Sequence, residues 1–302
     1  MSPRIGFIGL GNMGRPMAER LLGAGFALAV SDRDRARVQA FAGRAAAPAS
    51  LAELGRTSEF VITILPDGEA VRGVIAGPGE CVADGLGPGS VVIDMSSSSP
   101  VGTRALGEWL AARSIALVDA PVSGGVKRAA DGSLAIMAGG DPAVIERCGS
   151  LLAAMGKQIF LAGSLGCGHA MKALNNYVSA AGLVAASEAV AIGRRFGLDP
   201  VAMVDILNAS TGRNNSTEHK LKQHVFSGSF ASGFALALMA KDLRTALELA
   251  AATDTPVPLA AGCIALWNAA EERLGKAADH TEIARLLGAA GEPMPDLAPR
   301  KD

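Results

Sequence analysis

The segment GFIGLGNMGRPMAERL, residues 6–21, joins a short apolar run to a helical pattern through three glycines spaced G-x-G-x-x-G. In this spacing the first glycine allows a tight turn, the second lets the backbone approach a pyrophosphate, and the third lets helix and strand pack closely. The amides at the start of the helix then face the phosphates. The segment predicts a dinucleotide-binding turn whose contact residues are Gly9, Leu10, Gly11, Asn12, Met13 and Gly14.

The alternative is a glycine turn in an α/β domain that binds nothing, and the context of strand, turn and helix weighs against it. Asp32 lies 18 residues after Gly14, at the end of a second apolar run. A carboxylate there accepts hydrogen bonds from both ribose hydroxyls and repels a 2′-phosphate, which favours NAD. Arg33 leaves NADP open, because a guanidinium beside the ribose can hold that phosphate.

Short apolar runs alternate with helical patterns through the first half of the chain. Strands are expected at residues 4–8, 27–31, 60–65, 91–95 and 115–118, and helices at 12–24, 35–42, 69–75 and 101–113. Continuous apolar strands separated by helices predict a parallel sheet covered on both faces. The expected fold class is therefore α/β, a Rossmann-type doubly wound parallel sheet, with the loops at 94–100 and 119–125 on its ligand-binding edge.

After residue 163 the pattern becomes helical throughout. Residues 166–196 lack proline and are apolar on nearly every face, so they predict one buried helix about 45 Å long. Further helices are expected at 201–208, 218–226, 236–252, 259–274 and 281–287. We expect two domains: an NAD(P)-binding Rossmann domain at 1–163, and an all-α substrate and oligomerisation domain at 164–302 that begins with the long interdomain helix.

The composition excludes several classes of protein. Lys and Arg number 28 against 29 Asp and Glu, a net charge of -1, which argues against nucleic acid or an acidic membrane as the main partner. No apolar run reaches the roughly 20 residues of a membrane span, and the first residues show no cleavable signal pattern. Neither the four cysteines nor the histidines show metal-ligand spacing. We expect a cytoplasmic protein with reduced thiols and no metal.

A polar cluster opens the long helix in GCGHAMKALNN, residues 166–176. A lysine inside an apolar helix is costly unless it has partners, and Asn175 and Asn176 follow Lys172 by three and four residues, on or near its face. Burial and the helix dipole should lower the pKa of Lys172 towards the range of a general acid or base. The alternative is a lysine that extends to the surface beside two unrelated asparagines.

Four segments, in order over nearly the whole chain, resemble the β-hydroxyacid dehydrogenase family, which includes 3-hydroxyisobutyrate dehydrogenase and tartronate semialdehyde reductase. They are residues 6–21 and 166–176, quoted above, DAPVSGGVKRAADGSLAIMAGG at 119–140, and AKDL at 240–243. The resemblance implies an NAD(P)-binding N-terminal domain, an all-helical C-terminal domain and an active site in the cleft between them. It also implies assembly into a homodimer or homotetramer.

The resemblance further assigns roles residue by residue. Lys172 matches the catalytic lysine, and Asn176, with Asn175 beside it, matches the asparagine that holds the substrate. The loop that binds the substrate carboxylate matches Ser123, Gly124 and Gly125. Cofactor-contacting positions match Leu65, Pro66, Ser96, Ser97 and Lys241.

Two stretches differ from common members of the family or fall in a variable segment. Lys127 and Arg128 follow the substrate loop, and either attract an acidic substrate or form a solvated basic pair. Within residues 208–220, the polar side chains at 213–215 either select the substrate or belong to a helix connection capped by Ser216 or Thr217. His169, three residues before Lys172, either tunes that lysine or, in the interpretation we favour, is a partly exposed histidine without a role.

Together these features predict an NAD-dependent oxidoreductase that interconverts a small 3-hydroxy carboxylic acid and its semialdehyde or oxo acid by hydride transfer. Lys172 would act as the general acid or base while residues 123–125 hold the carboxylate. Two alternatives remain: a reductase of another small aldehyde acid, such as succinic semialdehyde or glyoxylate, and a catalytically silent NAD(P)-binding sensor. We expect no nucleic acid or membrane partner.

Overall fold

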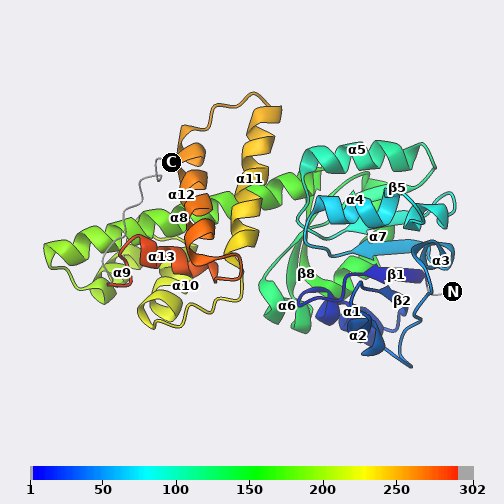
Figure 1. The fold of residues 1–302 in the computed structure, drawn as a ribbon, viewed down its shortest axis with the longest axis horizontal. Helices are drawn as coiled ribbons and strands as arrows, with labels where there is room; N and C mark the ends of the chain where they lie inside the picture. Colours follow the sequence, from blue (N-terminus) through cyan, green and yellow to red (C-terminus); the bar gives the residue numbers. More distant parts are fainter. Residues whose placement is uncertain (1–2, 292–302) are drawn as a thin grey trace. The chain divides into compact units, whose positions relative to one another are not determined.

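The structure is a computed structural model that describes residues 3–291. Within this range the chain forms two compact units, one ending at Lys172 and the other beginning at Ala173. Helix α8 (Cys167–Phe196), the long green helix of Figure 1, belongs to both units. Each unit has a hydrophobic core of its own. No helix in residues 3–291 is both long enough and apolar enough to cross a bilayer.

The first unit alternates strands and helices, as the sequence predicts. Its strands are β1 (Arg4–Ile8), β2 (Ala27–Ser31), β3 (Phe60–Thr63), β4 (Val91–Asp94), β5 (Ala116–Asp119), β6 (Val122–Ser123), β7 (Leu134–Gly139) and β8 (Gly156–Gly163). Its other helices are α1 (Gly14–Gly23), α2 (Arg35–Gln39), α3 (Leu51–Arg56), α4 (Gly68–Ala76), α5 (Pro100–Ala111), α6 (Gly125–Asp131) and α7 (Pro142–Met155), with a 3₁₀ turn at η1 (Val82–Asp84).

These strands form one sheet in the order β2–β1–β3–β4–β5–β7–β6, with β8 also paired to β7. The predicted parallel arrangement holds from β1 to β5. Beyond β5 the sheet is mixed, because β7 runs antiparallel to β5 and β6 and parallel to β8. The sequence analysis did not predict β7, α7 or β8. The segment LAIMAG of β7 mixes large apolar residues with alanine and glycine, which have weak strand propensity.

Helices cover both faces of the sheet, which confirms the doubly wound fold. Successive residues of a strand point to opposite faces. Phe7 and Ile93 therefore pack with α1, α6 and α7, whereas Ile8 and Val92 pack with α3, α4 and α5. Figure 1 shows α4 and α5 on one face of the sheet, and α1 and α6 on the other. The carboxyl ends of β1 to β5 all meet at one edge, where the glycine turn also lies.

The second unit is helical, as predicted. After α8 its helices are α9 (Pro200–Ala209), α10 (Asn215–His219), α11 (Leu236–Ala252), α12 (Pro258–Leu274) and α13 (Ile283–Leu286), with a 3₁₀ turn at η3 (His280–Glu282). One predicted helix, at 218–226, is instead the end of α10 followed by a π-helix, η2 (Leu221–Phe226). Trp267 of α12 is fully buried at the centre of this unit, in a core shared with Leu183 of α8 and Leu243 of α11.

Helix α8 is less buried than the sequence suggests. Val178, Ile192 and Phe196 are 68%, 70% and 86% exposed. Their spacing of fourteen and four residues places them on one face of the helix. Leu183 and Val190 lie on the side that packs into the core of the helical unit. A helix can therefore have apolar residues on nearly every face although the rest of the chain covers only one side of it.

A polar cluster lies inside the helical unit around His280. This histidine is buried, its Nδ1 lies 2.9 Å from the Ser232 hydroxyl, and its ring stacks on Trp267 with 6.4 Å between centroids. Burial, assisted by the positive charge of Lys220, lowers the pKa of His280 from 6.5 to about 4, although the carboxylate of Asp279 opposes the shift. His280 is therefore neutral in the folded protein at neutral pH.

This burial predicts a loss of stability in acid. Between about pH 4 and pH 6.5 the unfolded chain binds a proton at His280 that the folded chain does not. The free energy of unfolding therefore decreases as the pH is lowered through this range. From pH 7 to pH 5 this group should cost about 2 kcal/mol. His280→Asn, which cannot titrate, should lose about 2 kcal/mol less than the wild type over the same change, as measured by urea unfolding at both pH values.

His219→Asn is the matched control, because it makes the same substitution at an exposed histidine of the same unit. An identical pH dependence in the wild type and in His280→Asn would contradict the assignment of a buried neutral His280.

Candidate active site

The backbone of the glycine turn itself requires two of its three glycines. Gly9 has a φ of +100°, and a Cβ there would lie 2.3 Å from the carbonyl oxygen of Ile64. A Cβ on Gly14 would lie 1.8 Å from the carbonyl oxygen of Gly9. At Gly11, by contrast, the nearest atom is Nη1 of Arg37, at 3.4 Å. The missing side chain of Gly11 therefore leaves open surface, which a ligand backbone or phosphate can approach.

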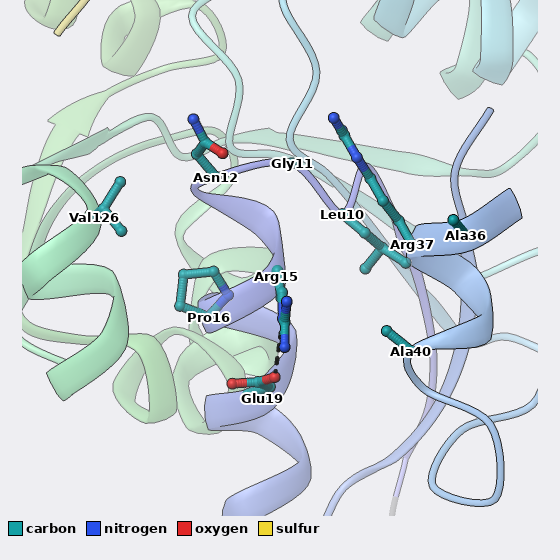
Figure 2. Close-up of a pocket in the computed structure, with 10 residues that line it drawn as sticks. All are labelled: Leu10, Gly11, Asn12, Arg15, Pro16, Glu19, Ala36, Arg37, Ala40 and Val126. Carbon is teal, nitrogen blue, oxygen red and sulfur yellow. Dashed lines mark hydrogen bonds and ion pairs between the residues drawn. The ribbon is translucent and has the colours of Figure 1, made fainter. Parts of the chain in front are cut away.

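A pocket of about 780 Å³ lies against this turn (Figure 2). It is lined by Leu10, Gly11 and Asn12 of the turn, by Arg15, Pro16 and Glu19 of α1, by Ala36, Arg37 and Ala40 of the α2 segment, and by Val126 of α6. The volume is within the range of about 300–1,000 Å³ that cofactor sites occupy. The open surface at Gly11, the start of α1 and this pocket together fit a dinucleotide.

Asp32 is held against the glycine turn, as its position after β2 predicts. Its Oδ2 accepts a hydrogen bond of 2.7 Å from the amide of Leu10, and its Oδ1 accepts one of 2.8 Å from the amide of Asp34. Nη1 of Arg37 lies 3.7 Å from Oδ2. Arg33 is exposed and lines, with Asp32, a second pocket of about 230 Å³.

The six residues predicted to contact the cofactor at the turn have different positions in the structure. Leu10, Gly11 and Asn12 line the pocket, although the Leu10 side chain belongs to the core and its backbone faces Asp32. Gly9 and Gly14 shape the turn. Met13 packs its side chain against the core, because the first turn of α1 lies directly on the sheet.

A hydrogen bond joins the two other predicted cofactor loops, at the ends of β3 and β4. The amide of Leu65 donates a 2.9 Å hydrogen bond to Oγ of Ser96. Ser96 is held in turn by buried Asp94, whose Oδ1 accepts from the Ser96 amide at 3.0 Å and from Oγ1 of Thr63 at 2.9 Å. Pro66 is exposed and Ser97 is half-buried in the same loops.

The predicted substrate loop lies between β6 and α6. Ser123 ends β6, and Gly124 and Gly125 follow with φ values of +132° and +68°. Both values lie in the region that favours glycine, so the conformation of this loop requires these two residues. Lys127 and Arg128 are exposed on α6, and a Cβ on Gly124 would lie 2.4 Å from Cδ of Arg128.

The start of α8 is anchored by Asp119, the last residue of β5. This fully buried carboxylate accepts hydrogen bonds of 2.8 Å from the amides of Gly166 and His169. Those amides lie at the start of α8, where N–H groups have no hydrogen-bond partners within the helix. The positive end of the helix dipole also attracts negative charge there. Gly168 allows the close approach, since a Cβ there would lie 2.2 Å from the carbonyl oxygen of Met137. Sequence reasoning quoted Asp119 in a motif but gave it no role.

The interpretation of His169 as partly exposed and without a role was wrong. His169 is buried, and its Nδ1 lies 2.8 Å from Oγ1 of Thr103. Because Thr103 donates its own hydroxyl proton to the carbonyl of Ser99, Nδ1 of His169 is the donor in this pair. Nε2 lies 3.6 Å from Oδ2 of Asp94. His169 thus connects α5 and the end of β4 to the start of α8, a contact that the periodicity of an all-apolar helix cannot reveal.

In the helical unit, three of the predicted site residues lie at or next to Asp242. The amide of Asn176 donates a 2.5 Å hydrogen bond to Oδ2 of Asp242, and Nζ of Lys241 lies 3.2 Å from Oδ1. Asn175 donates to Oδ1 of Asn176 at 3.1 Å. Asp242 is buried, and its place inside AKDL was a signal that the sequence analysis did not use. Lys172, four residues before Asn176 on α8, is half-buried.

Of the two interpretations of residues 208–220, a capped helix connection describes Asn214. Asn214 caps α10 by accepting hydrogen bonds from the amides of Ser216 and Thr217, at 2.8 and 3.2 Å. Arg213 and Asn215 are exposed. The cap is therefore Asn214, not Ser216 or Thr217 as expected, because the amide oxygen of asparagine reaches both free N–H groups of the first turn.

Comparisons with known proteins agree with this geometry. Residues 4–163 match the model for the NAD binding domain of 6-phosphogluconate dehydrogenase, and residues 166–287 match that for NAD-binding of NADP-dependent 3-hydroxyisobutyrate dehydrogenase. A 2-(hydroxymethyl)glutarate dehydrogenase from Eubacterium barkeri is 39% identical over 261 residues, 86% of each chain. The mitochondrial 3-hydroxyisobutyrate dehydrogenase of Drosophila melanogaster is 37% identical over 84% of this chain and 80% of its own.

Among solved structures, the 3-hydroxyisobutyrate dehydrogenase of Mycobacterium tuberculosis with L-serine superimposes with a TM-score of 0.86 at 32% identity, over 95% of this chain and 99% of that one. The match extends across both units, so it includes the glycine turn and the lysine helix. The family models describe NAD-binding domains, and the curated relatives and this structure are named as dehydrogenases of hydroxy acids. The chain belongs to the β-hydroxyacid dehydrogenase family and is an NAD(P)-dependent oxidoreductase.

Proposed function

We propose that this protein interconverts a small 3-hydroxy carboxylic acid and its semialdehyde or oxo acid, of the 3-hydroxyisobutyrate or tartronate semialdehyde type, with NAD as the preferred cofactor. The observation that carries the proposal is the row of Lys172, Asn175 and Asn176 along α8, which starts one turn after the helix is anchored by Asp119. The relatives named above support it, since 2-(hydroxymethyl)glutarate and 3-hydroxyisobutyrate both carry a hydroxyl on the carbon β to a carboxylate.

Lys172 is the general acid or base in the proposed reaction. In oxidation its neutral amine accepts the hydroxyl proton, and in reduction its ammonium donates a proton to the forming alkoxide oxygen. Asn176 keeps one N–H and one lone pair for the substrate, because Asp242 and Asn175 engage the others and orient the amide. The Ser123 hydroxyl and the amides of Gly124 and Gly125 hold the carboxylate, which positions the carbinol carbon.

A bound nicotinamide supplies the hydride acceptor in oxidation and the hydride donor in reduction. The residues that would hold the dinucleotide are Gly9, Leu10, Gly11, Asn12, Gly14, Asp32, Arg33, Leu65, Pro66, Ser96, Ser97 and Lys241. The preference for NAD rests on Asp32, whose charge opposes a 2′-phosphate beside the ribose. Arg37 offsets part of that charge from 3.7 Å, so the preference is a matter of degree.

We further propose that the chain divides near residue 163 into an NAD(P)-binding domain, which also contributes the loop at residues 123–125, and a helical domain that contributes most of the substrate residues and the assembly surface. Assembly as a homodimer or homotetramer is supported by the open apolar face of α8, formed by Val178, Ile192 and Phe196. Exposed apolar side chains that share one helix face are typical of association sites. A cytoplasmic setting is supported by the free thiols of Cys81, Cys148, Cys167 and Cys263.

Removing the lysine should abolish turnover and spare cofactor binding. Lys172→Ala should lower kcat by roughly 10²–10⁴-fold, the contribution of a positioned general acid or base. NADH affinity, measured by fluorescence titration, should stay within about twofold of the wild type, because the glycine turn is unchanged. Lys157→Ala, at an exposed lysine of β8, is the control. Near-normal turnover in Lys172→Ala, over a panel of three- and four-carbon hydroxy acids, would reject the proposed role.

Removing the charge of Asp32 should shift cofactor preference. Asp32→Asn keeps an acceptor for the amide of Leu10 and removes the repulsion of a 2′-phosphate. The ratio of kcat/KM for NAD to that for NADP should fall about tenfold or more, equivalent to about 1.4 kcal/mol. Asp34→Asn is the matched control, since asparagine preserves the cap of α2 at this exposed carboxylate. A wild type that prefers NADP would contradict the assignment to Asp32.

Charging the open face of α8 should dissociate the assembly. Ile192→Glu places a carboxylate in a surface that association would bury, so light scattering after size exclusion should report a smaller oligomer than the wild type. Val101→Glu makes the same change at an exposed apolar residue of α5 and should leave the mass unchanged. A wild-type monomer at micromolar concentration would refute the proposed assembly.

A further inference from the structure

Lys220 is a buried cation without a matching anion. It is 9% exposed, and its Nζ donates a 3.1 Å hydrogen bond to Oγ of Ser179 on α8. Among residues 3–291 no carboxylate oxygen lies within 4.0 Å of this Nζ. A buried ammonium is stable only with hydrogen bonds and opposite charge around it, so the surroundings of Lys220 are incomplete as they stand.

Asp279, the acid whose charge acts on Lys220, already accepts hydrogen bonds from other groups. Its oxygens accept hydrogen bonds of 2.9 Å from the Ser232 hydroxyl, 2.9 Å from the amide of Gly233 and 3.0 Å from the amide of Thr281. Burial lowers the pKa of Lys220 from 10.5 to about 8, and the attraction of Asp279 opposes that shift without cancelling it. His280, which also faces the cluster, contributes no negative charge. A further anion beside Lys220 would complete its surroundings.

Lys220 meets α8 on the stripe that carries the proposed substrate residues. Ser179 follows Asn175 by four residues and Asn176 by three, so the three side chains share one side of the helix. Lys172 precedes Ser179 by seven residues, two turns, which corresponds to about 10 Å along the helix axis. A molecule whose hydroxyl lies at Lys172 and whose body passes the asparagines therefore points its far end towards Ser179 and Lys220.

The backbone around Lys220 is unusual and aims the side chain inward. Lys220 lies between α10 and the π-helix η2, as the C-cap of the first and the N-cap of the second, with φ of -125° and ψ of -49°. Its carbonyl accepts from the amides of His224 and Val225, at 2.8 and 3.3 Å. Short π-helical turns are rare and occur frequently at functional sites. The exposed residues Glu218 and His219 precede Lys220, so the change of helix type coincides with its turn into the interior.

We propose that Lys220, together with the hydroxyl of Ser179, binds a second carboxylate at the far end of the substrate, so that the substrate class is a 3-hydroxy dicarboxylic acid. This assignment rests on the proposed function, in which Lys172 and Asn176 hold the reacting end. A purely structural lysine here would be replaceable by an apolar residue of similar length, because burying an uncompensated charge opposes folding. A ligand with a negative charge explains why a lysine occupies this buried position.

The test compares two substrates that differ at the far end alone: 2-(hydroxymethyl)pentanedioate, and 2-(hydroxymethyl)pentanoate, which has a methyl group in place of the distal carboxylate. Wild type should prefer the dicarboxylate by about tenfold or more in kcat/KM, mostly through KM. Lys220→Met should reduce that ratio of kcat/KM values about tenfold. Lys222→Met, two residues on and partly exposed, is the matched control and should keep the ratio of the wild type.

An equal loss on both substrates in Lys220→Met would assign the lysine a structural role and overturn the inference. Equal use of the two acids by the wild type would overturn it as well, while leaving the proposed function intact. Turnover of neither acid would count against the proposed function itself.

If Lys220→Met does not fold, the pH dependence of KM in the wild-type protein tests the same inference. The dicarboxylate should lose its advantage in KM as the pH rises through about 8, where Lys220 loses its proton. Asp279 and His280, the titratable groups that face Lys220, keep their charge states across that range, since both pKa values are lowered. A constant ratio of the two KM values from pH 7 to pH 9.5 would overturn the inference.

Discussion

The carboxylate of Asp119 is the contact on which the arrangement of the lysine helix depends. It lies at the end of β5, without exposure to solvent, and satisfies two amides in the first turn of α8. A buried carboxylate is tolerated here because free N–H groups and the positive end of the helix dipole surround it. Anchoring the first turn of α8 also positions Lys172, which follows His169 by three residues in the same unit.

The same device recurs at the ends of other parallel strands. Asp32 follows β2 and holds the amide of Leu10, and Asp94 ends β4 and holds the amide of Ser96. Loop amides at the carboxyl edge of the sheet have no partners in the ladder, and a short acidic side chain satisfies them while keeping the loop in one conformation. His169, at the start of α8, lies between Asp94 at the end of β4 and Thr103 of α5, so these three buried side chains bring β4, α5 and α8 together.

The helical unit uses its buried charges differently. Asp242 is matched, with Lys241 and Asn176 on its two oxygens. His280 avoids charge altogether, because burial favours its neutral form. Lys220 does neither: it keeps a cation in the interior with one hydroxyl as its hydrogen-bond partner. A matched or neutral group avoids the cost of an uncompensated buried charge, whereas Lys220 does not, which is why we propose a ligand of opposite charge beside it.

The sequence by itself determined the class of fold, the glycine turn, the acidic residue after β2 and the lysine with its two asparagines, because these follow from local spacing. Strand and helix periods, glycine positions and i to i+4 neighbours depend on residues close together in the chain. The roles of Asp119, His169, Asp242 and Lys220 were decided by tertiary structure. Each depends on residues far apart in sequence, such as His169 and Thr103 or Lys220 and Ser179. Burial and charge balance are properties of a packed neighbourhood, so no single stretch of sequence contains them.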